Sequence, residues 1–310
     1  MGNIRIGTRE SQLAIWQATQ VKKLLKKAGI ESELVYIKSE GDIDLITPLY
    51  DIGVQGIFTR SLDTALLNNK IDVAVHSLKD VPTQLSKGIV QVSVLKRGPV
   101  NDLLVFKNEE VQEKYTSLTT HHSFNIATSS IRRKAQWLNK FPDHTIHNLR
   151  GNVNTRLKKL QEENWDAAIF AQAGLERIGL RPQTSIVLDW MLPAPAQGAI
   201  VAVCREDDHN SFNACKKLND DRTEICTKIE RDFLRKLLGG CSTPISALAE
   251  IQNDRVHFKG NILSLDGSDK IEIERSGELK NAIHLGSQAA EELLAKGGAE
   301  IAERIRHGAK

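Results

Sequence analysis

Basic side chains and hydroxyl groups are concentrated in one segment of the sequence, residues 126–160. This segment has eight Lys or Arg residues and Asp143 as its only acid, which gives a formal net charge of +7, whereas the whole chain has +3. Thr128-Ser129-Ser130 stand directly before Ile131-Arg132-Arg133, where a helix is expected to begin. A helix start with hydroxyls, backbone N–H groups and two guanidinium groups can bind an anion. A capped, solvated helix with incidental basic residues is the alternative.

Two further arginines of the same segment are expected to face one cleft. Arg150 is predicted to end a strand, and Arg156 follows in the first turns of the next helix. The resulting positive field fits phosphate, carboxylate or nucleic acid. Neither of the glycine-rich motifs typical of nucleotide sites is present, so the pattern leaves these three classes of ligand open.

One carboxylate stands out by its position after an apolar run. Asp80 follows the predicted strand 72–76, with Lys79 beside it and the rigid Pro82 two residues later. An acid at the carboxyl end of a buried strand is placed where α/β proteins perform chemistry. The same residues would also fit an aspartate that only caps a turn.

The four cysteines are too few and too widely spaced for a disulfide framework or a CxxC site, so reduced thiols are expected. Cys241 differs from the others because Gly239-Gly240 precede it and Ser242-Thr243-Pro244 follow. A thiol in such an exposed turn is open to a bulky covalent adduct. Cys204, in contrast, lies in an apolar strand, where cysteine is usually a small buried hydrophobe.

Composition excludes several classes of protein. The chain has 310 residues, of which 40% are hydrophobic and 26% charged, values typical of a globular protein of two or three domains. No apolar run approaches the ~18 residues of a membrane span, and the strand-like start differs from a signal peptide. We therefore expect a cytoplasmic protein with no membrane partner. His121-His122 lack further ligands at metal-binding spacing, so no metal site is expected.

The elements that would position these side chains alternate in the first half of the chain. Strands are expected at residues 4–6, 33–38 and 72–76, with amphipathic helices at 11–27 and 58–67 between them. This alternation predicts an open α/β fold with parallel strands, in which ligands bind at the carboxyl ends of the strands.

The middle of the chain repeats this opening theme. Ile126-Ala127-Thr128 leads into a helix much as Ile6-Gly7-Thr8 does, which predicts two similar lobes that face each other across a cleft. Residues 193–198 are expected to form a hinge, and the strand 199–204 is expected to return to the first lobe.

The last third of the chain has a different pattern. A helix at 224–237, three strands and a helix at 279–296 predict a small α+β domain. We therefore predict three domains, namely residues 1–97 with 196–215, residues 98–195, and residues 216–310.

An ordered set of motifs resembles the porphobilinogen deaminase family, whose members are also called hydroxymethylbilane synthases. The matching stretches are Arg9-Glu10-Ser11 with Leu13-Ala14, Val75-His76-Ser77-Leu78-Lys79-Asp80-Val81-Pro82, Thr128-Ser129-Ser130-Ile131-Arg132-Arg133, Arg150-Gly151-Asn152-Val153-Asn154-Thr155-Arg156-Leu157, Leu192-Pro193-Ala194-Pro195 and Gly239-Gly240-Cys241-Ser242. The resemblance runs from Ile4 to about the end of the third domain.

The resemblance implies both a fold and an activity. The fold would be two lobes like those of type II periplasmic binding proteins, plus a small α+β C-terminal domain. The activity would be that of a transferase in tetrapyrrole (haem) biosynthesis, which joins four porphobilinogen molecules head to tail on a dipyrromethane cofactor. Each condensation would release ammonia, and hydrolysis would then release hydroxymethylbilane. The resemblance further implies a monomer whose partner is this small-molecule substrate.

The resemblance also implies roles for individual residues. Asp80 would be catalytic, and Cys241 would hold one dipyrromethane per chain through a thioether. The other residues implied to bind the cofactor are Lys79, Ser129, Arg132, Arg133, Arg150 and Arg156. The residues implied to bind substrate are Arg9, Ser11, Arg150, Arg156 and Arg177.

The sequence departs from the family pattern at five positions. Gln55 stands where lysine is common, Ser61 and Asp63 replace glutamates, Ala196 replaces a glycine of the hinge, and Val203 replaces a glutamate. We therefore assign no basic-lid role to the loop around Gln55. None of the five changes touches Asp80 or Cys241.

Two other classes of protein compete with this interpretation. A two-lobed anion-binding protein without catalysis would have no use for the Gly-Gly-Cys turn. A nucleic-acid binder would use the basic segment, but the chain lacks an aromatic stacking pattern and is net acidic outside residues 126–160. We therefore expect no nucleic-acid partner. Mass spectrometry separates the three classes, because only the deaminase would carry a covalent dipyrrole.

Overall fold

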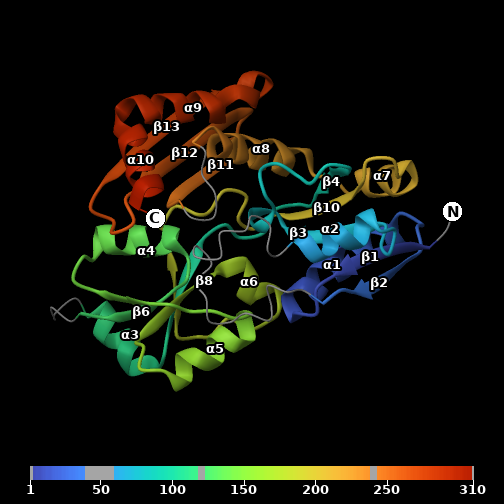
Figure 1. Cartoon of the computed structure of the whole chain (residues 1–310). Coiled ribbons are helices and arrows are strands. Elements are labelled where there is room, and N and C mark those ends of the chain that lie inside the picture. The colour runs from blue at the N-terminus through green and yellow to red at the C-terminus, as the bar shows by residue number, and fades with distance from the viewer. Residues whose placement is uncertain (1–2, 39–58, 118–122, 238–242, 309–310) are drawn as a thin grey trace.

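The computed structural model describes residues 3–38, 59–117, 123–237 and 243–308, which form three β-sheets with helices packed against them (Figure 1). The first sheet has the strand order β2-β1-β3-β10-β4. Its strands are β1 (Ile4–Thr8), β2 (Ser32–Tyr36), β3 (Val73–Ser77), β4 (Ile89–Val94) and β10 (Ile200–Arg205). Strand β1 is parallel to β2 and β3, whereas β10 is antiparallel to β3 and β4.

Helices cover both faces of the first sheet. On one face α1 (Gln12–Lys27) and α7 (His209–Lys216) share an apolar core with β1, β3 and β10. On the other face α2 (Arg60–Leu67) packs on the same strands. The three strands and two helices predicted for the start of the chain are therefore confirmed within the described residues, with the second helix described from Arg60.

The second sheet has the order β7-β6-β8-β5-β9. Its strands are β5 (Asp102–Phe106), β6 (Asn125–Ala127), β7 (Thr145–His147), β8 (Ala167–Ala171) and β9 (Ser185–Leu188). Helices α3 (Glu109–Thr116) and α4 (Ile131–Lys140) cover one face, and α5 (Val153–Glu162) and α6 (Gln172–Arg177) the other. Arg150 was predicted to end a strand, but β7 already ends at His147 because the chain turns there toward Asn152, which caps α5.

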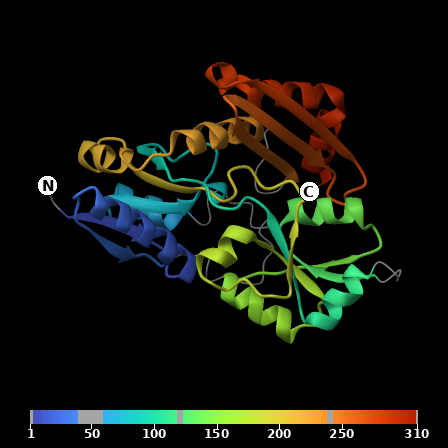
Figure 2. The same cartoon turned by 180° about the vertical axis from the view of Figure 1, so that it is seen from behind.

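The two sheets have the same topology, which confirms the predicted repeat. In each, three parallel strands are followed by an antiparallel strand supplied by a different part of the chain, β10 in the first and β5 in the second. The predicted return of strand 199–204 to the first lobe is thereby confirmed. Both lobes are open α/β sheets, as the sequence predicted, with helices on both faces. Figure 2 shows the two lobes from behind, with the connecting segments between them.

The segments that connect the lobes are tied to each other and to the C-terminal domain. The Gly98 N–H donates to the Gly198 carbonyl over 3.0 Å. Glu230, which is fully buried, accepts from the Arg97 guanidinium at 2.6 Å and from the Ala196 N–H at 2.6 Å. Ala196 has a φ of 62°, a left-handed conformation that favours glycine. The alanine at this departure from the family pattern therefore adopts the backbone conformation that a glycine would adopt more easily.

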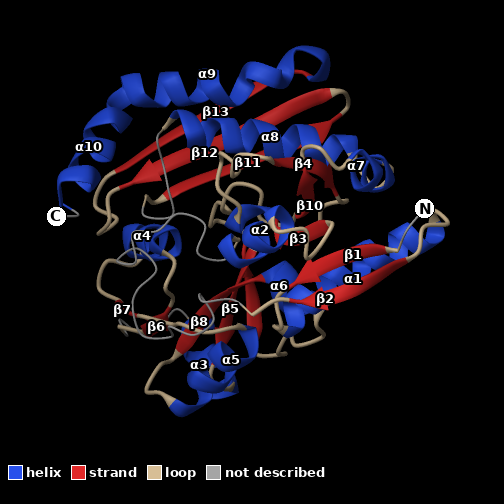
Figure 3. Ribbon diagram, turned by 45° about the vertical axis from the view of Figure 1, so that its right-hand side comes forward, coloured by secondary structure: helices blue, strands red, loops and turns tan. Residues whose placement is uncertain are grey.

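The C-terminal domain is an antiparallel sheet with helices on one face, as the colouring by secondary structure in Figure 3 shows. Its elements are α8 (Asp221–Lys236), β11 (Ile245–Gln252), β12 (Arg255–Leu263), β13 (Lys270–Glu278), α9 (Leu285–Leu293) and α10 (Ala299–Gly308). The predicted final helix 279–296 was partly wrong. Residues 279–284 form a 3-10 turn, and Gly297, with a φ of 106°, separates α9 from α10.

The division into three domains at the predicted boundaries stays a proposal, in which each domain is built around one sheet. None of the helices in the described ranges is long and apolar enough to cross a membrane.

Candidate active site

The start of α4 carries the basic residues that the sequence singled out. Ser130 is the N-cap, and its Oγ accepts from the Arg133 N–H at 3.4 Å. The Ser129 hydroxyl donates to the Leu149 carbonyl and accepts from the Leu149 N–H at 3.1 Å. Ser129 therefore joins the loop before α4 to the loop after β7, which leads to Arg150.

Arg132 and Arg133 are buried and share one carboxylate. Each donates over 2.7 Å to a different oxygen of Asp102, the first residue of β5. Arg132 also donates to the Leu192 carbonyl at 2.8 Å, and Arg133 to the Ile169 carbonyl at 2.9 Å. The two guanidinium groups hold the pKa of the buried Asp102 carboxyl far below its usual range. Both arginines are thus fixed in direction, and one of their two positive charges is balanced.

One donor of this cluster remains unused. The Nε–H of Arg133 is buried and finds no hydrogen-bond partner in the described part of the chain. A buried donor without a partner costs free energy unless a ligand or water accepts from it. The unused guanidinium face is therefore suited to a carboxylate or another anion.

The 3-10 turn Leu78–Asp80 follows β3 directly and brings Lys79 and Asp80 toward these arginines. The Lys79 Nζ donates to the Gln197 Oε1 at 3.0 Å, and the Gln197 amide in turn donates to Asp102 at 2.9 Å. Burial lowers the pKa of Lys79 to about 8, with the charges of Arg133 and Arg132 acting in the same direction and Asp80 and Asp102 opposing them. The electrostatic neighbours of Lys79 thus include residues of both lobes.

Arg156 approaches the same group from α5. Its Nε donates to the Gly151 carbonyl at 2.7 Å, in a turn where Gly151 has a φ of 116°. Burial lowers the pKa of Arg156 to about 10, and Arg133 and Arg150 lower it further, whereas Asp80 raises it. Asp80 and Arg156 are therefore close enough to interact, although they belong to different lobes.

The remaining predicted residues lie at two other places. Ser11 caps α1 by accepting from the Ala14 N–H at 3.3 Å. Burial lowers the pKa of His76 to about 3, and the positive charge of Arg9 lowers it further. Both positions lie at the carboxyl ends of strands of the first sheet.

Arg177 lies at the connection between the lobes. Its Nη2 donates to the Gly198 carbonyl at 2.6 Å, and its guanidinium lies 5.5 Å from the centre of the Trp16 ring. Burial lowers the pKa of Arg177 to about 10. The structure therefore places this arginine against the predicted hinge, apart from the group formed by Lys79, Arg132 and Arg133.

Two predicted features fall outside the described residues, namely Cys241 and the loop around Gln55. Sequence reasoning also missed two residues of the site. Asp102 could have been noticed as an acid directly before the apolar run of β5, and Gln197 as a polar residue within the predicted hinge. Within the described ranges no group of three or more His, Cys, Asp or Glu side chains is arranged to hold a metal ion.

The sequence matches two models of known protein families. The model of the porphobilinogen deaminase dipyromethane cofactor binding domain matches residues 4–213, and that of the porphobilinogen deaminase C-terminal domain matches residues 224–295. The chain belongs to the porphobilinogen deaminase family. Proteins named porphobilinogen deaminase from Desulforamulus reducens and Trichlorobacter lovleyi are each 40% identical to it, over 98% and 97% of this chain and 98% and 96% of theirs.

Likeness to solved structures is weaker. The methionine-binding protein MetQ covers 70% of this chain and 89% of its own, with 16% identity and a TM-score of 0.43. The residues of the site nevertheless fit the dipyrromethane that the porphobilinogen deaminase family binds. The fit rests on the unused Arg133 donor and on the cations around Asp80, which suit a ligand with several carboxylates.

Proposed function

We propose that this chain is a hydroxymethylbilane synthase, a transferase that joins four porphobilinogen molecules head to tail with release of ammonia. The observation that carries the proposal is the position of Asp80. Its half-buried carboxylate interacts electrostatically with Lys79 of the first lobe and Arg156 of the second. An anion binder would need the cations alone, whereas this reaction also needs a negative charge beside them.

Asp80 would act on the cation that porphobilinogen forms when it loses ammonia. Two unit charges about 4 Å apart interact by about 4 kcal/mol at an effective dielectric constant near 20. If this energy is gained mainly in the transition state, it corresponds to close to a thousandfold in rate. The same carboxylate can accept hydrogen bonds from pyrrole N–H groups.

The cations would hold the acetate and propionate groups that every pyrrole ring carries. Dipyrromethane, when bound through Cys241, supplies the primer to which the first substrate is added. Ser129, Lys79, Arg132 and Arg133 would orient its carboxylates. Residues proposed to bind the incoming substrate are Arg9, Ser11, Arg150, Arg156 and Arg177, of which Arg150 and Arg156 would also contact the cofactor. Because these charges are buried or half-buried, they are screened less than surface charges.

The covalent adduct provides the direct test of this function. We expect protein from a porphobilinogen-producing host to carry two pyrrole units, and Cys241→Ser to carry none, in intact-mass measurements. Wild-type protein from a host unable to make porphobilinogen is the control and should have the unmodified mass. An unmodified wild type from the producing host, or an adduct that survives the serine substitution, would contradict the assignment.

We also propose that the chain is a cytoplasmic monomer that binds neither membranes nor nucleic acid. This proposal is supported by the ion pairs of Arg132 and Arg133 with Asp102, which are buried within a single chain. Size-exclusion chromatography with light scattering tests the monomeric state, and a mass of twice 34.5 kDa would contradict it.

A further inference from the structure

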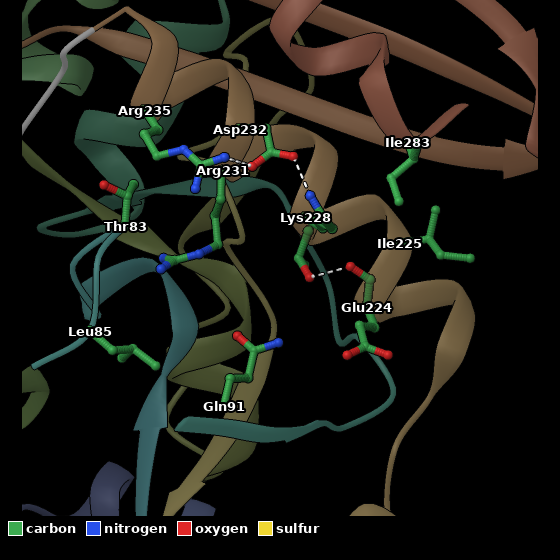
Figure 4. Close-up of a pocket in the computed structure, with 11 residues that line it drawn as sticks. Thr83, Leu85, Gln91, Glu224, Ile225, Lys228, Arg231, Asp232, Arg235 and Ile283 are labelled. Carbon is green, nitrogen blue, oxygen red and sulfur yellow. Dashed lines mark hydrogen bonds and ion pairs between the residues drawn. The ribbon is translucent and has the colours of Figure 1, made fainter. Parts of the chain in front are cut away.

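Helix α8 of the C-terminal domain lies against the segment that follows Asp80. A cavity of about 420 Å³ lies between them, with Thr83, Leu85 and Gln91 on one side and α8 on the other (Figure 4). The residues of α8 that line it are Glu224, Ile225, Thr227, Lys228, Arg231, Asp232 and Arg235. This contact joins the C-terminal domain to the first lobe next to the catalytic turn.

Arg231 is the residue of α8 that forms hydrogen bonds with the turn around Asp80. Its Nη1 donates to the Leu78 carbonyl at 3.2 Å and to the Val81 carbonyl at 2.8 Å, and its Nη2 donates to the Pro82 carbonyl at 2.6 Å. In sequence these three carbonyls lie on both sides of Asp80. Figure 4 shows the Arg231 side chain extended away from α8.

Three other charged residues of α8 that line the cavity are paired with each other. Asp232 accepts from Lys228 at 2.5 Å and from Arg235 at 2.7 Å, so these three residues satisfy one another along the helix surface. Arg231 forms hydrogen bonds to main-chain oxygens instead. Its contribution therefore depends on the shape of the guanidinium fork, which presents several N–H groups in fixed directions.

The turn whose carbonyls Arg231 binds is also held by the first lobe, because the Leu78 N–H donates to the Ala199 carbonyl over 3.0 Å and the Leu78 and Val81 side chains are buried. Within it, the Val81 N–H donates to the Leu78 carbonyl over 3.2 Å. Because peptide units are planar, fixing the carbonyls before and after Asp80 limits the rotation of the backbone that carries its side chain. The direction of the carboxylate then depends on a residue more than 150 positions away in sequence.

We propose that Arg231 is a positioning residue for Asp80, an inference that rests on the catalytic role proposed for Asp80. Helix α8 ends at Lys236, five residues before Cys241 in the sequence. The helix that leads to the cofactor cysteine therefore also holds the turn of the carboxylate that acts on the growing chain.

The test compares Arg231→Lys and Arg231→Leu with Arg235→Lys and Arg235→Leu on the same helix. Arg235 is a matched control because its side chain is 61% exposed and donates only to Asp232 among the described residues. The measurements are kcat and KM for porphobilinogen, the fraction of molecules loaded with dipyrrole by intact mass, and the melting temperature.

We expect Arg231→Lys to lower kcat per loaded molecule by about tenfold to a hundredfold, since a displacement of about 1 Å at a reacting group can cost that much. KM should change less than twofold, because Arg231 is not among the residues proposed to bind substrate. The lysine keeps the charge but cannot reach three carbonyls in the fork geometry. Arg231→Leu should lower kcat at least as much, and both Arg235 variants should keep kcat within twofold.

A purely structural role would give the opposite pattern, in which melting temperature or loading falls while kcat per loaded molecule stays at the wild-type value. That result would overturn the proposal, and Arg231→Lys decides the matter if Arg231→Leu does not fold. An Asp80→Asn enzyme measured in parallel separates the two hypotheses. Full activity of Asp80→Asn would contradict the catalytic role of Asp80. An inactive Asp80→Asn together with a fully active Arg231→Lys would contradict only the positioning role of Arg231.

Discussion

The two lobes have the same strand order but present different chemistry at the ends of equivalent strands. After β3, the third parallel strand of the first sheet, the chain forms the turn with Lys79 and Asp80. After β8, the equivalent strand of the second sheet, it enters α6 directly. The repeated fold therefore supplies two sets of strand ends, and only one of them carries the carboxylate proposed to be catalytic.

The first helices of the two lobes differ in a similar way. Ser11 caps α1 and Ser130 caps α4, each by accepting from an N–H group three residues later. The first turn of α1 has no charged residue, whereas that of α4 has Arg132 and Arg133. Capping thus belongs to the shared scaffold, whereas of these two helices only α4 has arginines in its first turn.

The antiparallel strands show how the second lobe accommodates these charges. Ile200 begins β10 opposite Ser77, and Asp102 begins β5 opposite Ala171. At equivalent positions, the first lobe has an apolar residue and the second has the carboxylate that both arginines bind. A buried cation pair therefore comes with its own buried counter-ion, as the cost of burying charge requires.

The strongest expected effect concerns the lobe that carries Asp80. Asp80→Asn keeps the shape of the side chain but removes its charge, so turnover of loaded enzyme should fall about a thousandfold. The rate of porphobilinogen consumption per loaded molecule measures this. Asp143→Asn, a change at an exposed acid of the second lobe, is the control and should leave the rate unchanged. Retention of more than about a tenth of the activity would leave under about 1.4 kcal/mol for the charge, too little for the proposed role.

A second prediction concerns the counter-ion that distinguishes the second lobe. Asp102→Asn leaves two buried guanidinium groups without a negative partner, so the free energy of unfolding should fall by about 3–5 kcal/mol. Urea unfolding measures the loss. Asp269→Asn breaks an exposed ion pair with Arg304 and should cost less than about 1 kcal/mol. Equal losses in the two variants would show that Asp102 is not the balancing charge inferred from its contacts.

The lowered pKa of Asp102 predicts that the free energy of unfolding depends on pH. The pKa of Asp102 is lowered by folding, so its charge stabilises the native state above the ordinary carboxyl pKa of about 4. This contribution is lost progressively as the pH falls below that value. The difference in unfolding free energy between wild type and Asp102→Asn should therefore be largest near neutral pH and shrink toward pH 2. A difference that stays constant over this range would rule out the ionised carboxylate as its source.

A further prediction concerns the stage of the reaction at which the loss of each basic residue takes effect. Arg132→Leu or Arg133→Leu should impair cofactor loading or the first additions of porphobilinogen, because both residues lie at the helix-start anion site. Arg177→Leu should act later or more mildly, and so should Lys159→Leu, a change at a half-buried lysine in the last turn of α5. Mass spectrometry of the covalent intermediates at limiting substrate separates these stages. A wild-type ladder and product-release rate in every variant would show that the basic segment does not bind the cofactor or the growing chain.

The smallest expected effect is a shift in a pH profile. Lys79 has a pKa lowered to about 8, so in the free enzyme it loses its proton as the pH rises through that value. Its attraction for substrate or cofactor carboxylates then weakens, and kcat/KM should decline on the alkaline side. Lys79→Arg should move this decline to higher pH, because arginine stays protonated. Identical alkaline limbs in the two enzymes would show that another group causes the decline.

Local patterns in the sequence were sufficient to predict several of these features. The serine caps, the repeat of β1–α1 by β6–α4 and the position of Asp80 after a buried strand each depend on residues within a few positions of one another. Their physical causes are hydrogen bonds and burial along a short stretch of chain. These are the causes that periodicity and capping rules describe.

Features that depend on distant partners could not be predicted in this way. Asp102 meets Arg132 and Arg133 only after β5 has joined a sheet of later strands. In the sequence, Arg231 is one of several charged residues on a predicted helix. Its hydrogen bonds to the carbonyls near Asp80 are known only from the structure. The predicted helix 279–296 ended directly before Gly297, but its first six residues form a 3-10 turn, and α10 beyond Gly297 was not predicted.

The strand β10 also determines the order in which the two sheets can be completed during synthesis. All strands of the second sheet lie between Asp102 and Leu188, so that sheet can close as soon as this stretch has emerged from the ribosome. In the first sheet, β4 pairs with β10 and with no other strand of the described chain, and β10 begins only at Ile200. Until then β3 and β4 have unpaired edges, the kind of surface that favours aggregation. The lobe that is translated first is therefore finished last.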